Sequence, residues 1–256
     1  MASLALRPLS IGEVIDASFQ VYRRHFSALA TIVLVCNGLP VLLQVYGRSG
    51  GGIHLALTLV YAVLVVVLSL VATGATVFVV SESYLGRAIT AREALSRALP
   101  FVVPLIVVSL SVGLMAFVGF LLLVVPGVIA VCGLAVSVPA LVVESTSPTD
   151  AMGRSWGLTR GYRLRMFGLF VLIFLLILIP YVAIMGAVGV TAAVLGATGA
   201  KGLTTVLILL GTVIAAIVQL LLSPLYQAAL VIAYYDLRVR KEGFDLELLA
   251  SVLQPA

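Results

Sequence analysis

Charged residues are scarce in this chain of 256 amino acids. Asp, Glu, Lys and Arg together account for 10% of it, and hydrophobic residues account for 62%. A soluble globular domain is about 25% charged. The deficit of charge therefore excludes an ordinary soluble domain and predicts a polytopic membrane protein.

Cysteine and histidine, which supply most metal sites, occur only twice each. Cys36 and Cys132 lie in apolar runs, where an isolated cysteine usually packs as a small hydrophobe, so we expect neither a disulfide nor a metal site. His25 and His54 fall on opposite sides of the membrane in the topology derived below, so they cannot share a metal ion. No Gly-rich phosphate loop or nucleophile elbow occurs in a suitable context. The sequence therefore predicts a protein that is not an enzyme and has no cofactor.

Six apolar stretches are long enough to cross a membrane, for which a helix needs about 20 residues. They are residues 26–45, 54–81, 99–124, 126–143, 166–188 and 203–235. Only the sequence VVPGV, around Pro126 and Gly127, separates the third stretch from the fourth, and it predicts a tight turn. Residues 189–202 are too small and Gly-rich to add a seventh span. We expect an all-α bundle of six transmembrane helices, forming one integral membrane domain over residues 1–256.

The net charge of +5 could indicate nucleic acid binding, but the positions of the cations indicate a membrane surface instead. Thirteen of the 15 Lys and Arg residues precede the first span or follow the second, fourth or sixth. Only Arg48 and Lys201 lie on the other side. Because cytoplasmic loops are enriched in Lys and Arg, we expect a cell-membrane protein (inner or plasma membrane) with both termini in the cytoplasm.

Short amphipathic segments precede the first, third and fifth spans. They cover residues 10–24, 90–99 and 147–159. Each begins with a capping box or a looser version of one, in which Ser10 pairs with Glu13, Thr90 with Glu93, and Ser147 with Asp150. Apolar or small residues then recur at the same helical offsets. We expect three interfacial helices in the plane of the cytoplasmic headgroups.

With their spans, these segments predict three copies of one unit. The units are residues 10–82, 90–144 and 147–236, followed by a short cytoplasmic tail, 237–256. Units of the same orientation imply a pseudo-threefold axis along the membrane normal. A capping box is only a four-residue pattern, so chance similarity is the alternative.

An acidic residue ends the second span of every unit. Glu82, Glu144 and Asp236 lie where the helix dipole is already negative, so we expect arginines to compensate them. The candidates are Arg97, Arg154 and Arg160. These charges either fix the helix ends and the topology, or they form a cytoplasmic gate or a headgroup site.

No Asp, Glu, Lys or Arg occurs near the middle of any span. The polar residues inside the spans are neutral. The sixth span carries Gln219, Ser223 and Gln227 at intervals of four residues, around Pro224. The second carries Ser69, Thr73 and Thr76 on one face, and the first carries Asn37 and Gln44. Such residues either bond neighbouring helices or line a polar cavity in which Pro224 frees a backbone carbonyl.

Three motifs resemble the membrane domain family of glycerophosphoryl diester phosphodiesterases. They are LRPLSIGEVIDASFQVYRRHF (6–26), VPALVVESTSPTDAMGRSWGLTRG (138–161) and IAYYDLRVRKEGFDLELL (232–249). The resemblance implies a stand-alone integral membrane domain of poorly defined role. The catalytic barrel of such enzymes carries a His-Arg-Gly motif, and no His-Arg pair occurs in this chain, so phosphodiesterase activity is not implied.

Two functions fit these features. The leading one is a non-enzymatic membrane protein that binds or organises membrane lipids or a membrane protein partner. The alternative is a transporter or permease for a lipid-like or small amphiphilic solute. A continuous polar cavity open to one side would favour transport, whereas a closed, dry bundle would favour a scaffold. The oligomeric state does not follow from the sequence.

A topology reporter fused after Ala256 tests the cation asymmetry. We expect a reporter that works only in the cytoplasm to be active, because the positive-inside rule places the C-terminal cations there. A reporter that is active only outside the cytoplasm, fused at the same point, should be silent. Activity of that reporter would contradict the predicted topology.

Overall fold

A computed structural model describes residues 7–48 and 55–243, without the side chains of residues 44–48 and 55–57. All regular structure in these ranges is helical. The helices are α1 (Ile11–Arg24), α2 (Phe26–Arg48), α3 (Leu55–Tyr84), α4 (Ala91–Ala98), η1 (Leu99–Phe101), α5 (Val102–Leu122), α6 (Val124–Gly133), α7 (Ser137–Glu144), α8 (Pro148–Thr159), α9 (Arg163–Ala197) and α10 (Lys201–Glu242). Six apolar stretches among them are long enough to cross a membrane, which is the pattern of a multi-pass membrane protein. His54 and most of the predicted tail lie outside the described residues.

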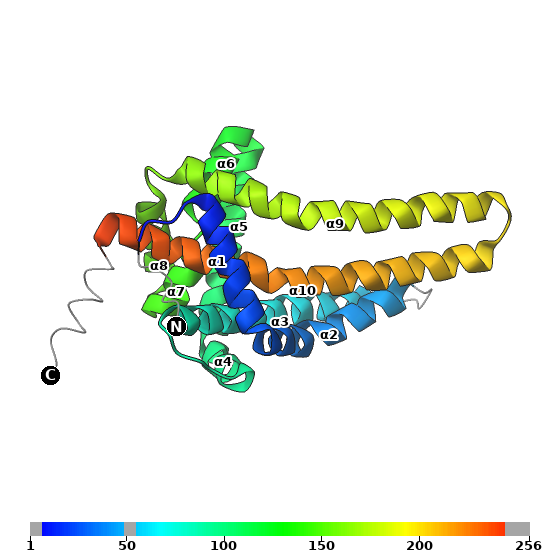
Figure 1. Ribbon diagram of the computed structural model, residues 1–256, viewed down its shortest axis with the longest axis horizontal. Coiled ribbons are helices and arrows are strands. Elements are labelled where there is room, and N and C mark those ends of the chain that lie inside the picture. Colours follow the sequence, from blue (N-terminus) through cyan, green and yellow to red (C-terminus); the bar gives the residue numbers. More distant parts are fainter. Residues whose placement is uncertain (1–6, 49–54, 244–256) are drawn as a thin grey trace.

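The last two helices form a long hairpin that extends beyond the other helices (Figure 1). α9 has 35 residues and α10 has 42. At 1.5 Å per residue, each is about 50 to 60 Å long, well above the roughly 30 Å of a bilayer core. α2 and α3 pack against α10, whereas α6 packs against α9. The short helices α1, α4 and α8 lie at the end away from the hairpin tip.

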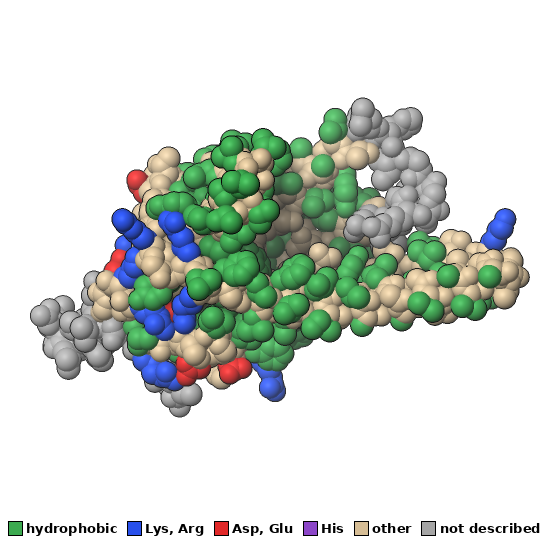
Figure 2. All heavy atoms as spheres, turned by 90° about the horizontal axis from the view of Figure 1, so that it is seen from above, with side chains coloured by type: hydrophobic (Ala, Val, Ile, Leu, Met, Phe, Trp, Pro, Cys, Tyr) green, Lys and Arg blue, Asp and Glu red, His purple; other side chains and the backbone are tan. Residues whose placement is uncertain are grey.

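The surface separates apolar sides from a charged end. Figure 2 shows hydrophobic side chains along the body and most Lys, Arg, Asp and Glu side chains at the end away from the hairpin tip. Lys201 begins α10 at that tip. Large apolar side chains such as Leu110, Leu121 and Leu164 are more than two-thirds exposed. In water such a surface would drive aggregation, whereas lipid solvates it.

The turn between the third and fourth spans differs from the prediction. It occurs at Leu123, which is extended (φ −167°, ψ 159°), and Pro126 falls inside the first turn of α6. Proline is tolerated there because the first N–H groups of a helix have no partner within it. The span itself is divided into α6 and α7, because Pro139 cannot donate to the carbonyl four residues before it.

The hairpin tip also differs from the prediction. Residues 189–202, which were not predicted to span, mostly continue α9 to Ala197, and the turn is confined to residues 198–200. Gly199 makes this turn with φ +80°, a conformation that L side chains avoid. At the charged end, α10 runs on to Glu242, so Asp236 lies inside the helix and not at its C-terminus. The dipole argument for Asp236 was therefore wrong.

Substitution of Gly119 tests the close approach of α5 and α6. A Cβ at this position would lie 2.8 Å from the Cα of Gly127, so we expect Gly119→Ala to lower the free energy of unfolding by about 1–3 kcal/mol, as overpacking does. Thermal unfolding of the purified protein in detergent measures this. The control is Gly113→Ala in the same helix, where a Cβ meets nothing within 4 Å. Equal melting temperatures for the two variants would contradict the close approach.

Candidate functional site

A polar groove of about 410 Å³ lies between α2, α3 and α10. The groove brings together the predicted stripe of Gln219, Ser223 and Gln227 with the polar residues predicted on the first two spans. From α2 it takes Asn37, and from α3 it takes Tyr61, Ser69, Thr73 and Thr76. The Gln44 side chain lies outside the described part. All residues that line the described groove are neutral.

Three hydrogen bonds join the helices across this groove, and in one of them the Tyr61 hydroxyl of α3 donates to the Pro40 carbonyl of α2 at 2.9 Å. The Ser69 hydroxyl donates to Oδ1 of Asn37 at 3.2 Å, which links α3 to α2. The Gln227 amide donates to Oγ1 of Thr73 at 3.3 Å, which links α10 to α3. Such bonds between transmembrane helices contribute about 0.6 kcal/mol on average. They therefore tie the walls together only weakly.

The carbonyl that Pro224 frees is not left unpaired. Proline cannot donate to the carbonyl of Leu220, but the Ser223 hydroxyl donates to it at 2.9 Å. The freed carbonyl is therefore paired within the helix and is not open to a ligand. Gln219, one turn earlier, is exposed, and its amide makes no hydrogen bond with the described part of the chain. This amide is one polar group that the groove leaves available to a ligand.

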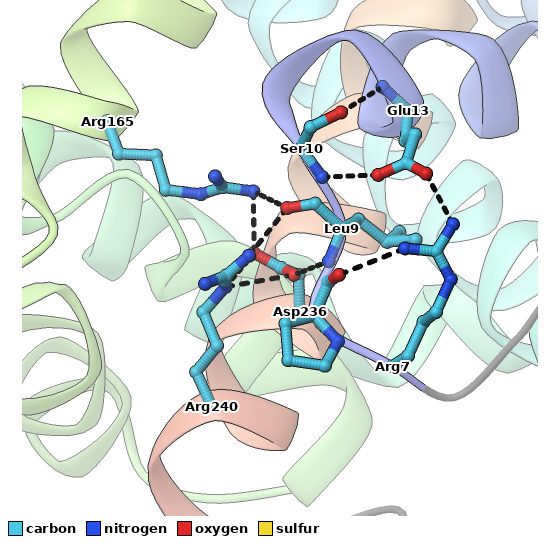
Figure 3. Close-up of polar contacts among 8 residues, drawn as sticks. Arg7, Leu9, Ser10, Glu13, Arg165, Asp236 and Arg240 are labelled. Carbon is cyan, nitrogen blue, oxygen red and sulfur yellow. Dashed lines mark hydrogen bonds and ion pairs between the residues drawn. The ribbon is translucent and has the colours of Figure 1, made fainter.

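Asp236 forms the centre of a cluster at the charged end (Figure 3). Its side chain is 1% exposed. It accepts from the backbone N–H of Leu9 at 2.7 Å, from Arg165 at 3.0 Å and from Nε of Arg240 at 3.0 Å. Both arginines also donate to the Leu9 carbonyl. The cluster therefore joins the residue before the cap of α1 to α9 and α10.

The other two acids lie in comparable clusters. Glu82 of α3 pairs with Arg97 of α4 at 3.0 Å, and Glu144 of α7 pairs with Arg154 of α8 at 2.9 Å. Arg97 and Arg154 each lie seven residues after the N-cap of their helix. The corresponding position of α1 is Ala17, which is buried.

Further polar groups complete these clusters. Arg154 also binds Glu242, and the Tyr234 hydroxyl donates to Glu144 at 2.5 Å. The hydrogen bond with Glu242, more than that with Glu144, raises the pKa of Arg154 above its already high value. On α1, the Ser10 backbone N–H and then Arg7 lower the pKa of Glu13 to about 2. Glu13 therefore stays ionised at neutral pH beside Arg7.

Sequence reasoning missed several members of these clusters. Arg160, a predicted partner, makes no ion pair with the described residues. Arg240 and Glu242 were missed because α10 was expected to end near Tyr235. They lie four residues after Asp236 and Arg238, which is the spacing of ion pairs on a helix. A prediction that continued the helix to Glu242 would have identified both residues from this spacing. No local signal points to Arg165, since its partner lies 71 residues away.

Removing the charge of Asp236 tests the cluster around it. Asp236→Asn leaves two guanidinium groups, each about one-fifth exposed, without their carboxylate. We expect the free energy of unfolding to fall by about 3 kcal/mol, the lower end for breaking a buried ion pair, and amide hydrogen exchange in α1 to accelerate. The control is Asp16→Asn, an exposed residue with no ion pair among the described residues. Unchanged exchange in α1 would contradict the role of the cluster as its anchor.

Comparison with known proteins identifies one family. Residues 46–237 match the family described as "Domain of unknown function (DUF7847)", so the chain belongs to that family. No curated protein and no solved structure matches the chain. The match concerns a family without an assigned function and does not bear on the resemblance to the glycerophosphoryl diester phosphodiesterase membrane domain.

Proposed function

We propose that this member of the DUF7847 family is a non-enzymatic, multi-pass protein of the cell membrane that binds a membrane lipid in the groove between α2, α3 and α10. One observation carries the proposal: three apolar helices direct neutral polar side chains into a single groove of about 410 Å³. Ligand sites are typically of this size, with a few convergent polar groups. The groove argues against a closed, dry scaffold, and it supports both lipid binding and the transport function considered below.

The depth of the groove supports a lipid ligand. Gln227 and Gln219 precede Asp236 by nine and 17 residues on the same helix, or about 13 and 25 Å along its axis. If the acidic clusters mark the headgroup level, the groove lies within the hydrocarbon core. Lipids are the most abundant molecules at that depth of the membrane.

The orientation that we propose places both termini in the cytoplasm, with α1, α4 and α8 as interfacial helices. The grouping of cations at the end that carries these helices supports it (Figure 2). Anionic headgroups of the cytoplasmic leaflet would attract this end.

A pseudo-threefold arrangement of the three units is also part of the proposal. Each short helix packs on the closing helix of the preceding unit, namely α4 on α3, α8 on α7 and, in cyclic order, α1 on α10. The shared position of Arg97 and Arg154 after their caps supports the same relation. The first unit departs from it, since Arg165 and Arg240 replace an arginine on α1.

Transport of a lipid-like or small amphiphilic solute is the second candidate. Pro40 in α2 and Pro224 in α10 both line the groove. Proline inside a helix removes a backbone hydrogen bond and permits bending, so two of the three walls contain a point where they could bend. The resemblance to the glycerophosphoryl diester phosphodiesterase membrane domain is compatible with either function.

Native mass spectrometry of the purified full chain tests the proposed function. We expect a retained lipid in the wild type and loss of most of it in Ala216→Phe, because the larger side chain would fill the groove that Ala216 lines. The matched control is Ile217→Phe, at the next position of α10, where the side chain is 50% exposed. A wild type without retained lipid, or equal retention by the two variants, would refute the proposal.

A further inference from the structure

A second pocket, of about 310 Å³, lies between α9 and α10. Its walls are mainly apolar, and include Phe174, Ile177 and Leu178 from α9 and Val218 and Leu222 from α10. It therefore has the character of the hydrocarbon around it and offers no charge to a ligand. The function proposed above does not use it.

Gln219 borders both the polar groove and this apolar pocket, and no other described residue lines both. The groove lies against Ala216, Leu220 and Ser223, whereas the pocket lies against Val218 and Leu222. Successive residues of a helix are rotated by about 100°, so the two hollows occupy neighbouring faces of α10. A molecule with a polar part and an apolar part could extend past Gln219, with its polar part in the groove and its apolar part in the pocket.

The groove determines the kind of headgroup that fits. The polar groups of its described lining are amides, hydroxyls and a phenol, which both donate and accept hydrogen bonds, and the rest of the lining is apolar. A phosphate or ammonium group at this depth would be a charge without a partner, which is costly in a medium of low dielectric constant. A hydroxyl-bearing, uncharged headgroup matches the lining without that cost.

We propose that the ligand is a lipid with an uncharged, hydroxyl-bearing headgroup, such as a monoacylglycerol or diacylglycerol. The headgroup lies in the polar groove and bonds to the Gln219 amide, and an acyl chain lies in the α9–α10 pocket. This inference rests on the proposed lipid-binding function and specifies the class of lipid and the path of its chain.

A monoacylglycerol that carries a diazirine in its acyl chain is the probe. The full chain is reconstituted in nanodiscs, irradiated and digested, and the labelled peptides are identified by mass spectrometry. We expect labelling to concentrate in residues 174–184 and 215–222. Unlabelled monooleoylglycerol should compete with it, whereas phosphatidylglycerol at the same concentration should not.

Two pairs of variants separate the headgroup from the chain. Gln219→Leu should reduce labelling by about three- to tenfold, the range for one hydrogen bond within a membrane. Its control, Thr205→Val, replaces a polar residue of α10 outside both hollows and should have no effect. Val218→Phe should abolish labelling of the pocket because it occupies the space of the chain, whereas Ile217→Phe, on the exposed side, should not.

The outcomes distinguish this inference from the function on which it rests. Equal competition by phosphatidylglycerol, or labelling that Val218→Phe leaves unchanged, would overturn the inference while the groove still retained lipid in native mass spectrometry. Labelling spread evenly over the apolar surface, with no retained lipid in the wild type, would overturn both.

Discussion

The carboxylate of Asp236 holds together three parts of the chain that lie far apart in sequence. It binds the Leu9 backbone, Arg165 and Arg240 while almost wholly buried. Separating either arginine from the carboxylate breaks a buried ion pair, which costs several kcal/mol, and releasing Leu9 leaves hydrogen bonds unmade in a poorly solvated site. The arrangement fixes α1 across the end of α10 and the start of α9 beside it. Because α10 forms one wall of the groove and one wall of the apolar pocket, the position of both hollows depends on this cluster.

The bundle is therefore held firmly at one end and loosely at its centre. At the charged end, each of the three acids meets at least one arginine. In the groove, the helices are joined by a few neutral hydrogen bonds, such as that between Gln227 and Thr73. These bonds are weak in membranes because the separated helices can find other partners. In α10, the Ser223 hydroxyl bonds the carbonyl of Leu220, to which Pro224 cannot donate. This combination suits a site whose walls separate slightly to admit a ligand while the layer of charges keeps their order.

Much of the fold could be predicted from the sequence, since it depends on local patterns. Apolar length indicates the six long stretches, and the pairs Ser10 with Glu13, Thr90 with Glu93 and Ser147 with Asp150 mark where α1, α4 and α8 begin. The polar stripe on α10 was visible as a four-residue spacing. What could not be predicted depends on distant partners. The cyclic contact of α1 with α10, the role of Arg165, and the apolar pocket beside α9 all require knowledge of which helices are neighbours. The break between α6 and α7 combines both causes: Pro139 is a local one, whereas Ser155 of α8, which donates to the Gly133 carbonyl and accepts from the Val136 N–H there, is a distant one.

The packing of α1 on α10 sets an order of events during biosynthesis. Leu9 and Asp236 are separated by 227 residues, and Arg165 precedes Asp236 by 71. Chains are synthesised at about 5 to 20 residues per second. Asp236 is therefore made roughly 4 to 14 s after Arg165 and roughly 11 to 45 s after Leu9. The helix α1 is thus made long before its final partner on α10. In that interval the capping box at Ser10 keeps α1 helical, and the link through His25 keeps it beside the candidate span in α2. If α1 lies at the membrane surface as proposed, its amphipathic character serves assembly before it serves the finished structure.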